Sequence, residues 1–478
     1  MSSLPQYNLV DVLKGEIYPA SVTIEAGKIA AIERHGNEID ETLTYLMPGF
    51  VDAHIHVESS MLLPGEFART AVTHGTVATV SDPHEIANVC GVAGVDLMLR
   101  NAQQTPFKFC FGAPSCVPAT NFETAGAKLG VEEVTQLLDR EQIGYLSEVM
   151  DFPGVLSRSP EIMAKIQAAK DRNKPVDGHA PGLRGDDARN YLAAGISTDH
   201  ECFTIEEALD KLKAGCMIAI REGSAARNFE ALETLVDLHP EMCMLCSDDK
   251  HPDEFLLGHI DRLVARAVGN GRDLMKVLQA ACVNPVKHYS LDVGLLQQGD
   301  PADFIVVEDL KEFKVLETWL DGVLVAKDGQ CLFDAPSPEV INNFVAQPIR
   351  ESQLSVAVEG TQIRLIEAID GQLITNHTKD ELTAIDGCLN SDPARDILKI
   401  VVVNRYIDAE PSVAFVRGFG LNTGAFASSV AHDSHNVVAV GCGDADILAA
   451  INAVIESRAG CLFRPMGRRK FYRYRWRA

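Results

Sequence analysis

Two histidines separated by one residue, His54 and His56, end the apolar run that begins at Gly49. Side chains of a strand alternate between its two faces, so both imidazoles would project in the same direction. Two imidazoles placed in this way can bind one metal ion. The competing interpretation is a chance His-x-His pair on a surface loop, and we favour metal binding.

Four later strand-like runs also end in residues of the metal-ligand type, which are Glu148, His179, His200 and Asp248. A lone histidine is usually structural, but five strand ends with such a residue are hard to assign to chance. Together with the first pair they give four histidines and two carboxylates, which would suit two divalent ions bridged by Glu148. Nitrogen and oxygen ligands favour manganese or iron and also allow zinc.

These residues are positioned by strand-like and helix-like stretches that alternate over residues 48–284. Helical patterns at 131–139, 160–171 and 205–213 lie between strands. Eight strands alternating with helices predict an α/β fold, a (β/α)8 TIM-like barrel whose strand C-termini face the active site. The predicted strands are 49–54, 76–81, 107–112, 144–148, 175–178, 196–200, 217–221 and 242–247.

The segments on either side of the barrel, 1–47 and 285–335, are rich in β-type runs. We expect them to form one small, composite β-sandwich domain. Residues 336–478 predict a third, C-terminal α+β domain, with buried strands at 398–403 and 437–440.

Eight longer sequence blocks are spread over most of the chain. The first four are PGFVDAHIHVESS from Pro48, DPHEIANV from Asp82, EVMDFPGV from Glu148 and DGHAPGL from Asp177. The others are REGSAARN from Arg221, CSDD from Cys246, GFGLN from Gly418 and HDSHN from His432. These blocks resemble the adenine deaminase family of the amidohydrolase superfamily. Many amidohydrolases bridge their metals with a carboxylated lysine on the fourth strand, and the resemblance implies that Glu148 takes its place here.

The resemblance implies hydrolytic deamination of adenine to hypoxanthine and ammonia at a binuclear metal centre. Two metal ions lower the pKa of bound water, so a shared hydroxide can attack C6 of the purine at neutral pH. Asp248 could accept the proton and pass it to the leaving amine. The ring nitrogen beside C6 also needs a proton donor, and four carboxyl groups stay open for this role: Glu58, Glu85, Glu201 and Glu222.

Three polar residues after the seventh predicted strand are candidates for the substrate pocket. Arg221, Glu222 and Ser224 lie in one short block, REGS. Their functional interpretation is that they read the edge of the purine. The alternative is an ion-paired loop without substrate contact.

Two further groups of polar residues could likewise be either functional or structural. Asp82 and His84, with Glu85 beside them, would form a substrate shell or a further metal site, or else a turn built by Asp-Pro. His432 and His435 lie outside the predicted barrel. They would either complete the pocket as a lid or belong to an exposed turn.

A competing motif matches parts of the zinc-dependent nucleobase deaminases. His56-x-Glu58 and Cys243-x-x-Cys246 correspond to the His-x-Glu and Cys-x-x-Cys elements, but Met242 stands where the proline is expected. In an extended strand the two cysteines would point to opposite faces. Core packing is therefore the better interpretation of these thiols.

The composition is that of a globular protein, with 46% hydrophobic and 23% charged residues and a formal net charge of -24. So acidic a surface repels phosphate backbones, and we expect no nucleic-acid partner. The absence of a run of eighteen apolar residues argues against a membrane partner. The N-terminal residues lack a secretion-signal pattern, so we expect a cytoplasmic protein with reduced cysteines. The resemblance implies a small-molecule substrate, adenine, and we also expect a homo-oligomer, a dimer.

Two other functions stay open. The first is a different amidohydrolase activity on another cyclic amidine or amide, which the pocket residues around Arg221 would decide. The second is an inactive product, because the chain is short at its C-terminus relative to the resembling family. Residues 461–478 hold seven Lys or Arg, five aromatic residues and no acid. This basic tail is either solvated or foreign to the fold, as after a shifted reading frame, and truncation could then leave apolar strands exposed.

Overall fold

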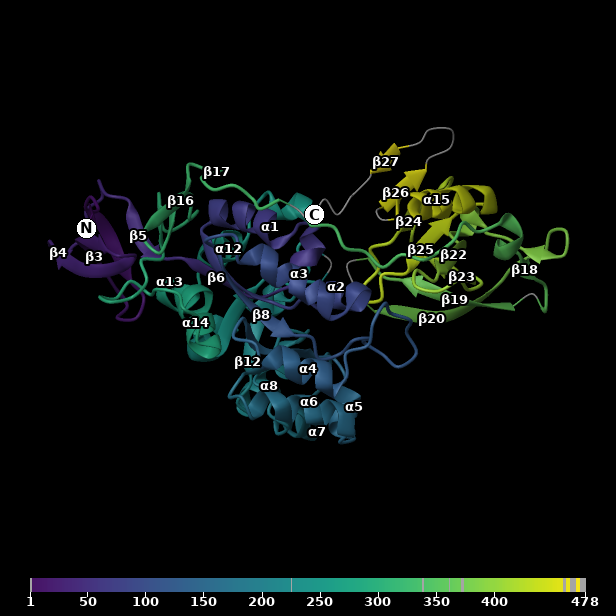
Figure 1. Cartoon of the computed structure of the whole chain (residues 1–478), viewed down its shortest axis with the longest axis horizontal. Helices are drawn as coiled ribbons and strands as arrows, with labels where there is room; N and C mark the ends of the chain where they lie inside the picture. The colour runs from purple at the N-terminus through teal and green to yellow at the C-terminus, as the bar shows by residue number, and fades with distance from the viewer. Residues whose placement is uncertain are drawn as a thin grey trace. The chain divides into compact units, whose positions relative to one another are not determined.

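The structure is a computed structural model that describes residues 2–224, 226–337, 339–360, 362–370, 374–458, 461–464 and 470–472. The chain forms two compact units. The colours of Figure 1 follow the chain from its N-terminus to its C-terminus. The first comprises Met1–His84, Val95–Cys116 and Leu129–Pro338. The second comprises Glu85–Gly94, Val117–Lys128 and Glu339–Ala478, so it takes two short segments from the early part of the sequence.

The first unit is built around eight parallel strands in sequence order. Hydrogen bonds between neighbouring strands join β6, β7, β8, β9 and β10 in one sheet and β11, β12 and β13 in another. The two sheets meet where Ser197 N donates to Val176 O at 2.9 Å and where Asp248 N donates to His54 O at 2.9 Å. The predicted barrel is therefore confirmed, with strands β6 (Phe50–Ile55), β7 (Thr76–Ser81), β8 (Lys108–Ala113), β9 (Ile143–Val149), β10 (Val176–Gly178), β11 (Thr198–Asp199), β12 (Met217–Arg221) and β13 (Cys243–Cys246).

The barrel strands are apolar or β-branched, and most of their residues are buried on both faces. All six residues of β7, TVATVS, are buried, which is typical of a parallel strand covered on both sides. Gly49, just before β6, permits close packing, since a Cβ at this position would lie 2.2 Å from Cγ1 of Val77. The barrel strands are thus packed closely against their neighbours.

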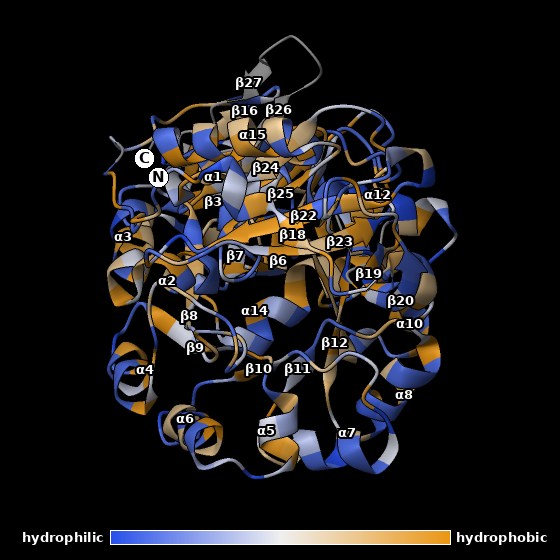
Figure 2. Ribbon diagram, turned by 90° about the vertical axis from the view of Figure 1, so that its right-hand side faces the viewer, coloured by the Kyte–Doolittle hydropathy of each residue, from blue (hydrophilic) through white to orange (hydrophobic). Residues whose placement is uncertain are grey.

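Helices follow the strands along the chain and pack on them (Figure 1). Their ribbons carry both hydrophilic and hydrophobic turns, as expected for helices with one buried face (Figure 2). In α8 the Thr204 hydroxyl accepts from Glu207 N at 3.3 Å and so caps the first turn. The main helices of this unit are α1 (Pro64–Ala71), α3 (Val92–Ala102), α4 (Val131–Leu138), α6 (Pro160–Lys170), α7 (Gly185–Leu192), α8 (Ile205–Lys213), α12 (Ile260–Gly269), α13 (Leu274–Leu278) and α14 (Asn284–Tyr289).

The two segments flanking the barrel join in one β-rich part of the first unit, as predicted. Their strands follow the order β1-β3-β2-β5-β14-β15-β16-β17, with β4 also paired to β3. The junction is the antiparallel pair of β5 (Tyr45–Pro48) and β14 (Phe304–Val307), and Leu9, Leu46 and Phe304 lie in its core. The other strands are β1 (Ser2–Ser3), β2 (Tyr7–Asp11), β3 (Glu16–Glu25), β4 (Lys28–Arg34), β15 (Val315–Leu320), β16 (Val323–Lys327) and β17 (Gln330–Cys331).

The second unit has an α+β architecture, as predicted for the C-terminal part. Its largest sheet has the order β20-β19-β23-β22-β25-β24-β26-β27. Helix α15 (Asp444–Ser457) packs on this sheet through Ile447 and Ile451, which share a core with Val401 and Ala439. The strands are β19 (Gln362–Ala368), β20 (Thr375–Glu381), β22 (Leu398–Val403), β23 (Ser412–Arg417), β24 (Ala425–Ser428), β25 (Val437–Gly441), β26 (Cys461–Arg464) and β27 (Lys470–Tyr472).

The basic C-terminal segment is described in part. Strand β26 pairs with β24, and β27 pairs with β26. Residues 465–469 and 473–478 of the predicted foreign tail lie outside the described residues. Within the described part of the chain, no helix has both the length and the apolar character that a bilayer crossing requires.

Candidate metal centre

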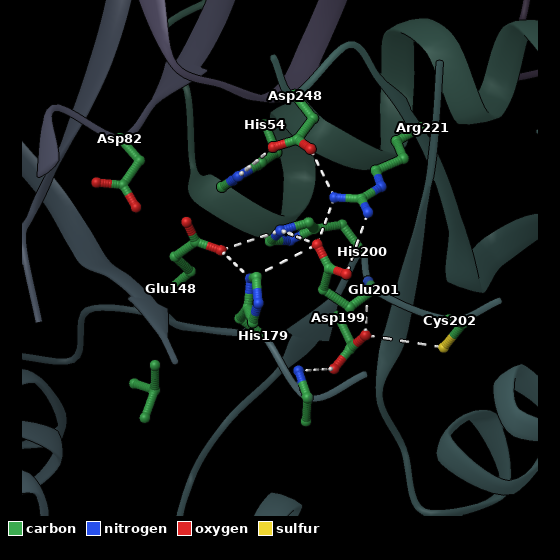
Figure 3. A network of polar contacts seen from close by, with 12 residues as sticks. His54, Asp82, Glu148, His179, Asp199, His200, Glu201, Cys202, Arg221 and Asp248 are labelled. Atoms are coloured by element: carbon green, nitrogen blue, oxygen red, sulfur yellow. Dashed lines mark hydrogen bonds and ion pairs between the residues drawn. The ribbon is translucent and has the colours of Figure 1, made fainter. Parts of the chain in front are cut away.

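The six predicted ligands lie at the C-terminal ends of five barrel strands. Figure 3 labels five of them: His54, Glu148, His179, His200 and Asp248. His54 lies in β6 and Glu148 in β9, while the other four follow the ends of β6, β10, β11 and β13. His179 is partly exposed and the remaining five are buried. The structure brings all six together in overlapping groups of His, Asp and Glu.

Glu148 lies between two sets of histidines. Its Oε1 atom is 3.4 Å from Nε2 of His56, whereas its Oε2 atom is 3.0 Å from Nε2 of His200 and 2.6 Å from Nδ1 of His179. Burial opposes the charged carboxylate, but the His179 ring and hydrogen bonds from the three histidines outweigh it and hold the pKa of Glu148 well below its usual range. A charged carboxylate with its two oxygens facing different ligand sets is suited to bridge two cations.

Asp248 completes the first ligand set. Its Oδ1 atom lies 3.2 Å from Nε2 of His56 and 3.5 Å from Nε2 of His54, and its Oδ2 atom accepts from Arg221 at 2.5 Å. Burial disfavours the charge, but Arg221 and the two histidines outweigh it and hold the pKa of Asp248 well below its usual range. The carboxylate therefore faces the ligands with one oxygen and is held by a guanidinium through the other.

Nδ1 of His54 is buried and has no hydrogen bond in the described structure. Buried polar atoms in proteins almost always have a partner, so this arrangement fits side chains that bind a cation. The Glu201 and Glu148 carboxylates, opposed by burial, raise the pKa of His179 to about 9. Four imidazoles and two carboxylates are a suitable donor set for first-row divalent metals.

Arg221 and Glu201 are held in an ion-pair network beside the ligands (Figure 3). Arg221 is only 1% exposed and donates to both Glu201 and Asp248. Glu201 Oε1 lies 3.6 Å from Nδ1 of His179 and 3.7 Å from Nε2 of His200. Glu201 is thus the proton-donor candidate that reaches the second ligand set directly, and Arg221 holds it.

Glu222 and Ser224 are paired with other residues, as expected if they belong to an ion-paired loop and do not contact the substrate. Glu222 Oε1 accepts from Arg266 at 2.7 Å. The Ser224 hydroxyl donates to Glu254 at 2.9 Å and accepts from His251 N at 2.9 Å. A direct role of these two residues in substrate binding stays a prediction.

Asp82, His84 and Glu58 lie close to the same ligands. His84 Nδ1 is 3.2 Å from Asp82 Oδ2 and 3.4 Å from Glu148 Oε1, and the four ligand atoms of His56, Asp82, His84 and Glu148 lie within 4.8 Å of one another. The Asp-Pro turn is also present, since His84 N donates to Asp82 Oδ1 at 3.1 Å. Glu58 is buried in a short 3-10 helix, η1 (Val57–Ser60), directly after His56.

Glu85, His432 and His435 form a separate group within the second unit. Both histidines hydrogen-bond to the Glu85 carboxylate. Burial opposes the charge of Glu85, but the two histidines outweigh it and hold its pKa well below the usual range. This favours the carboxylate over the acid form that a proton donor needs.

The two cysteines of the competing zinc motif are buried in β13. Burial raises the pKa of Cys243 to about 12 and also raises the pKa of Cys246 well above its usual value. Metal binding by cysteine requires the thiolate, so these raised values fit core packing.

The sequence patterns did not indicate a buried network behind β6 and β13. Asp52 Oδ1 accepts from Ser247 N at 3.0 Å, and Asp52 Oδ2 lies 2.7 Å from Nε2 of His259. His259 Nδ1 in turn lies 2.7 Å from the Thr76 hydroxyl. The network fixes the residue that precedes Asp248. An aspartate inside an apolar run, two residues before a predicted ligand, is the signal that could have revealed it.

A second supporting group holds the chain after β10 and β11. Asp199 Oδ2 accepts from Ala180 N at 3.1 Å, and Asp199 Oδ1 accepts from Glu201 N at 2.8 Å. The fully buried Lys211 lies 3.1 Å from Asp199 Oδ2. The only sequence signal is the position of Asp199 directly before a predicted ligand, since its lysine partner comes from a helix.

Two family profiles match the chain. The profile described as "Amidohydrolase family" matches residues 45–325, and the one described as "Adenine deaminase C-terminal domain" matches residues 372–469. A protein of Salinibacter ruber named adenine deaminase is 56% identical over 95% of this chain and 83% of its own length. One of Sulfurovum sp. with the same name is 57% identical over the same shares.

Solved structures show the same fold at low sequence identity. A beta-aspartyl dipeptidase of Fervidobacterium islandicum AW-1 has a TM-score of 0.51 at 15% identity, over 69% of this chain and 98% of that one. An N-acetyl-D-glucosamine-6-phosphate deacetylase of Mycobacterium smegmatis has a TM-score of 0.51 at 16% identity, over 68% of this chain and 100% of that one.

Proposed function

Because the chain belongs to the adenine deaminases of the amidohydrolase family, we propose that it hydrolyses adenine to hypoxanthine and ammonia with two divalent metal ions. The observation that carries this proposal is the position of Glu148, whose two carboxylate oxygens face different histidine sets. Manganese or iron is the proposed metal, with zinc as the third option. The dimeric state and the cytoplasmic location stay predictions.

The proposed ligands divide into two sets around Glu148. His54, His56 and Asp248 would hold one ion, His179 and His200 would hold the other, and Glu148 would bridge them. When bound, the ions supply a nucleophile for C6 of the purine by lowering the pKa of water. The protein contributes the fixed positions of six buried or nearly buried donors.

Asp248 is the proposed residue for proton movement. It would accept a proton from the attacking water and pass it to the amine that leaves C6. Its Oδ2 atom is held by Arg221, so the carboxylate keeps one orientation while the other oxygen faces the ligands. For the ring nitrogen, Glu201 and Glu58 are the candidates next to the ligands, whereas Glu222 is paired with Arg266.

Metal reconstitution of the full chain tests the proposal. Metal-free protein is loaded with manganese, iron or zinc, and adenine loss is followed by absorbance together with ammonia release. We expect activity to return with metal, and His54→Ala and His179→Ala to lose both metal and turnover. His239→Ala, which lies outside the ligand set, is the matched control. Full metal loading and turnover in His54→Ala would contradict the assignment.

A substrate panel separates the proposed reaction from another amidohydrolase activity. Purines, pyrimidines and hydantoins would be compared under the same metal loading. We expect adenine to give the highest kcat/KM. Ammonia release from a pyrimidine or opening of a hydantoin, without adenine turnover, would move the assignment to the alternative.

A further inference from the structure

The second unit contains a histidine-carboxylate cluster made from distant parts of the sequence. Glu85 lies in the first turn of α2 (His84–Cys90), and His432 and His435 lie between β24 and β25. His432 Nδ1 and His435 Nε2 hydrogen-bond to different oxygens of Glu85. One ligand-type atom from each residue lies within 4.8 Å of the other two.

We propose that Glu85, His432 and His435 bind a divalent transition-metal ion of their own, separate from the pair proposed for the barrel. Two imidazoles and one carboxylate form a donor set that suits iron, manganese or zinc. Three protein ligands leave further coordination positions for water or an additional carboxylate. The ion would connect α2 to a loop almost 350 residues later in the chain, both within the second unit.

Two more carboxylates lie near this cluster and favour a cation there. Burial and then the charges of Asp433 and Glu85 raise the pKa of Glu123. Glu123 Oε2 is buried and has no hydrogen bond in the described structure. Three acidic groups thus surround the two imidazoles. A divalent cation would offset this negative charge.

The loop that carries the histidines is held in place by neighbouring residues. Asn436 accepts from Arg405 N at 3.0 Å and donates to Thr124 O at 3.0 Å, and Arg405 also donates to His435 O at 3.3 Å. His435 has a φ of 54°, a left-handed conformation that is uncommon for a residue other than glycine. A strained ligand-type residue supported in this way is typical of a preorganised site.

The competing explanation is a simple ion pair, in which the histidines only neutralise Glu85. The two explanations differ in metal content and in metal-induced stability. A bound ion stabilises the folded state by mass action, whereas a simple ion pair gives no such response. Activity on adenine is not needed to tell them apart.

The experiment is a metal titration of the full chain. Metal-free protein is titrated with manganese and with zinc, free metal is removed, and bound metal per chain is measured by elemental analysis. We expect three equivalents for the unmodified protein and two for His432→Asn/His435→Asn. The exposed His377→Asn, in the same unit, should keep three. Saturation of the unmodified protein at two equivalents, or an unchanged count in the double variant, overturns the proposal.

Two further variants separate loss of the metal site from loss of the fold, and the proposed third ion from the two ions proposed for the barrel. Glu85→Gln keeps a hydrogen-bonding side chain but removes the charge, and we expect the third equivalent to bind about tenfold or more weakly. Unchanged affinity in Glu85→Gln, with an unchanged far-ultraviolet circular dichroism spectrum, would overturn the proposal. His54→Ala/His179→Ala should lose the barrel ions and keep the one held by Glu85, so the two assignments can fail independently.

Discussion

Lys211 Nζ lies 3.1 Å from Asp199 Oδ2, and neither side chain is exposed to solvent. Lys211 also donates to Ala180 O at 2.7 Å, while Asp199 accepts from Ala180 N. The pair therefore connects the chain after β10, which carries His179, with the chain after β11, which carries His200. A buried ion pair behind two ligands links the stability of the barrel to the geometry of the centre.

Replacing Lys211 with methionine should lower the free energy of unfolding by about 3–5 kcal/mol, because Asp199 is left buried without its cation. Chemical denaturation of the metal-loaded protein measures this. The matched control is Lys213→Met on the same helix, whose side chain is 75% exposed. That control should change stability by no more than about 0.5 kcal/mol. Equal stabilities of the two variants would show that the pair contributes little.

Arg221→Lys should lower kcat/KM for adenine by about 10–100-fold, as for other residues that hold a metal ligand. A lysine lacks the planar fork with which Arg221 contacts both Glu201 and Asp248. Steady-state kinetics with measured metal content would check this. Arg227→Lys, with a half-exposed side chain in the same loop, should leave kcat/KM nearly unchanged. An Arg221→Lys enzyme with full activity would rule out the positioning role.

The sequence was sufficient to predict the barrel, and it indicated six ligand candidates, whose role as metal ligands stays a prediction. Strands buried on both faces have continuous apolar patterns, and a ligand at a strand end is visible in the sequence because the C-terminal ends of barrel strands share one face. Local patterns of this kind predicted β6 to β13 within a few residues. The β-rich runs on both sides of the barrel also predicted that the two flanking segments join.

The supporting contacts could not be predicted in the same way. Lys211 belongs to an amphipathic helix, and no local pattern distinguishes a buried lysine there from an exposed one such as Lys213. The two short segments that join the second unit, Glu85–Gly94 and Val117–Lys128, lie inside the stretch with barrel periodicity. Their partners are more than 200 residues away, so only the three-dimensional structure reveals them.

Acid should destabilise the protein in part through His288. Burial lowers the pKa of this histidine from 6.5 to about 4. Between these values the unfolded chain binds a proton that the folded chain does not, so stability falls as the pH falls through this window. One such group contributes at most about 1.4 kcal/mol per pH unit.

The measurement is the free energy of unfolding of the metal-free protein from pH 7 to pH 4.5. In the unmodified protein His288 Nε2 lies 3.1 Å from the Ser197 hydroxyl. His288→Asn keeps a polar side chain at this position, and its free energy of unfolding should depend less steeply on pH. The exposed His377→Asn should follow the unmodified protein. Identical slopes for all three proteins would contradict the assignment to His288.

Asp52→Asn should reduce deamination without removing the metal ligands. Asp52 accepts from Ser247 N at 3.0 Å and contacts His259 Nε2 at 2.7 Å, so both its oxygens act as acceptors. An amide replaces one acceptor by a donor and leaves a buried hydrogen bond unmade, which costs about 1–3 kcal/mol of stability. Ser247 would then shift, and Asp248 with it.

Because Asp248 is both a proposed ligand and the proposed proton carrier, its displacement should act on kcat more than on KM. We expect kcat to fall by about 10–100-fold in Asp52→Asn, with weaker metal binding in a chelator competition assay. Asp171→Asn, an exposed change in the same unit, controls for the loss of one negative charge. A fall in stability alone, with kcat and metal affinity unchanged at a temperature where the variant is folded, would restrict Asp52 to a structural role. A fall in kcat that follows metal affinity would instead show that the network behind β6 and β13 sets the position of Asp248.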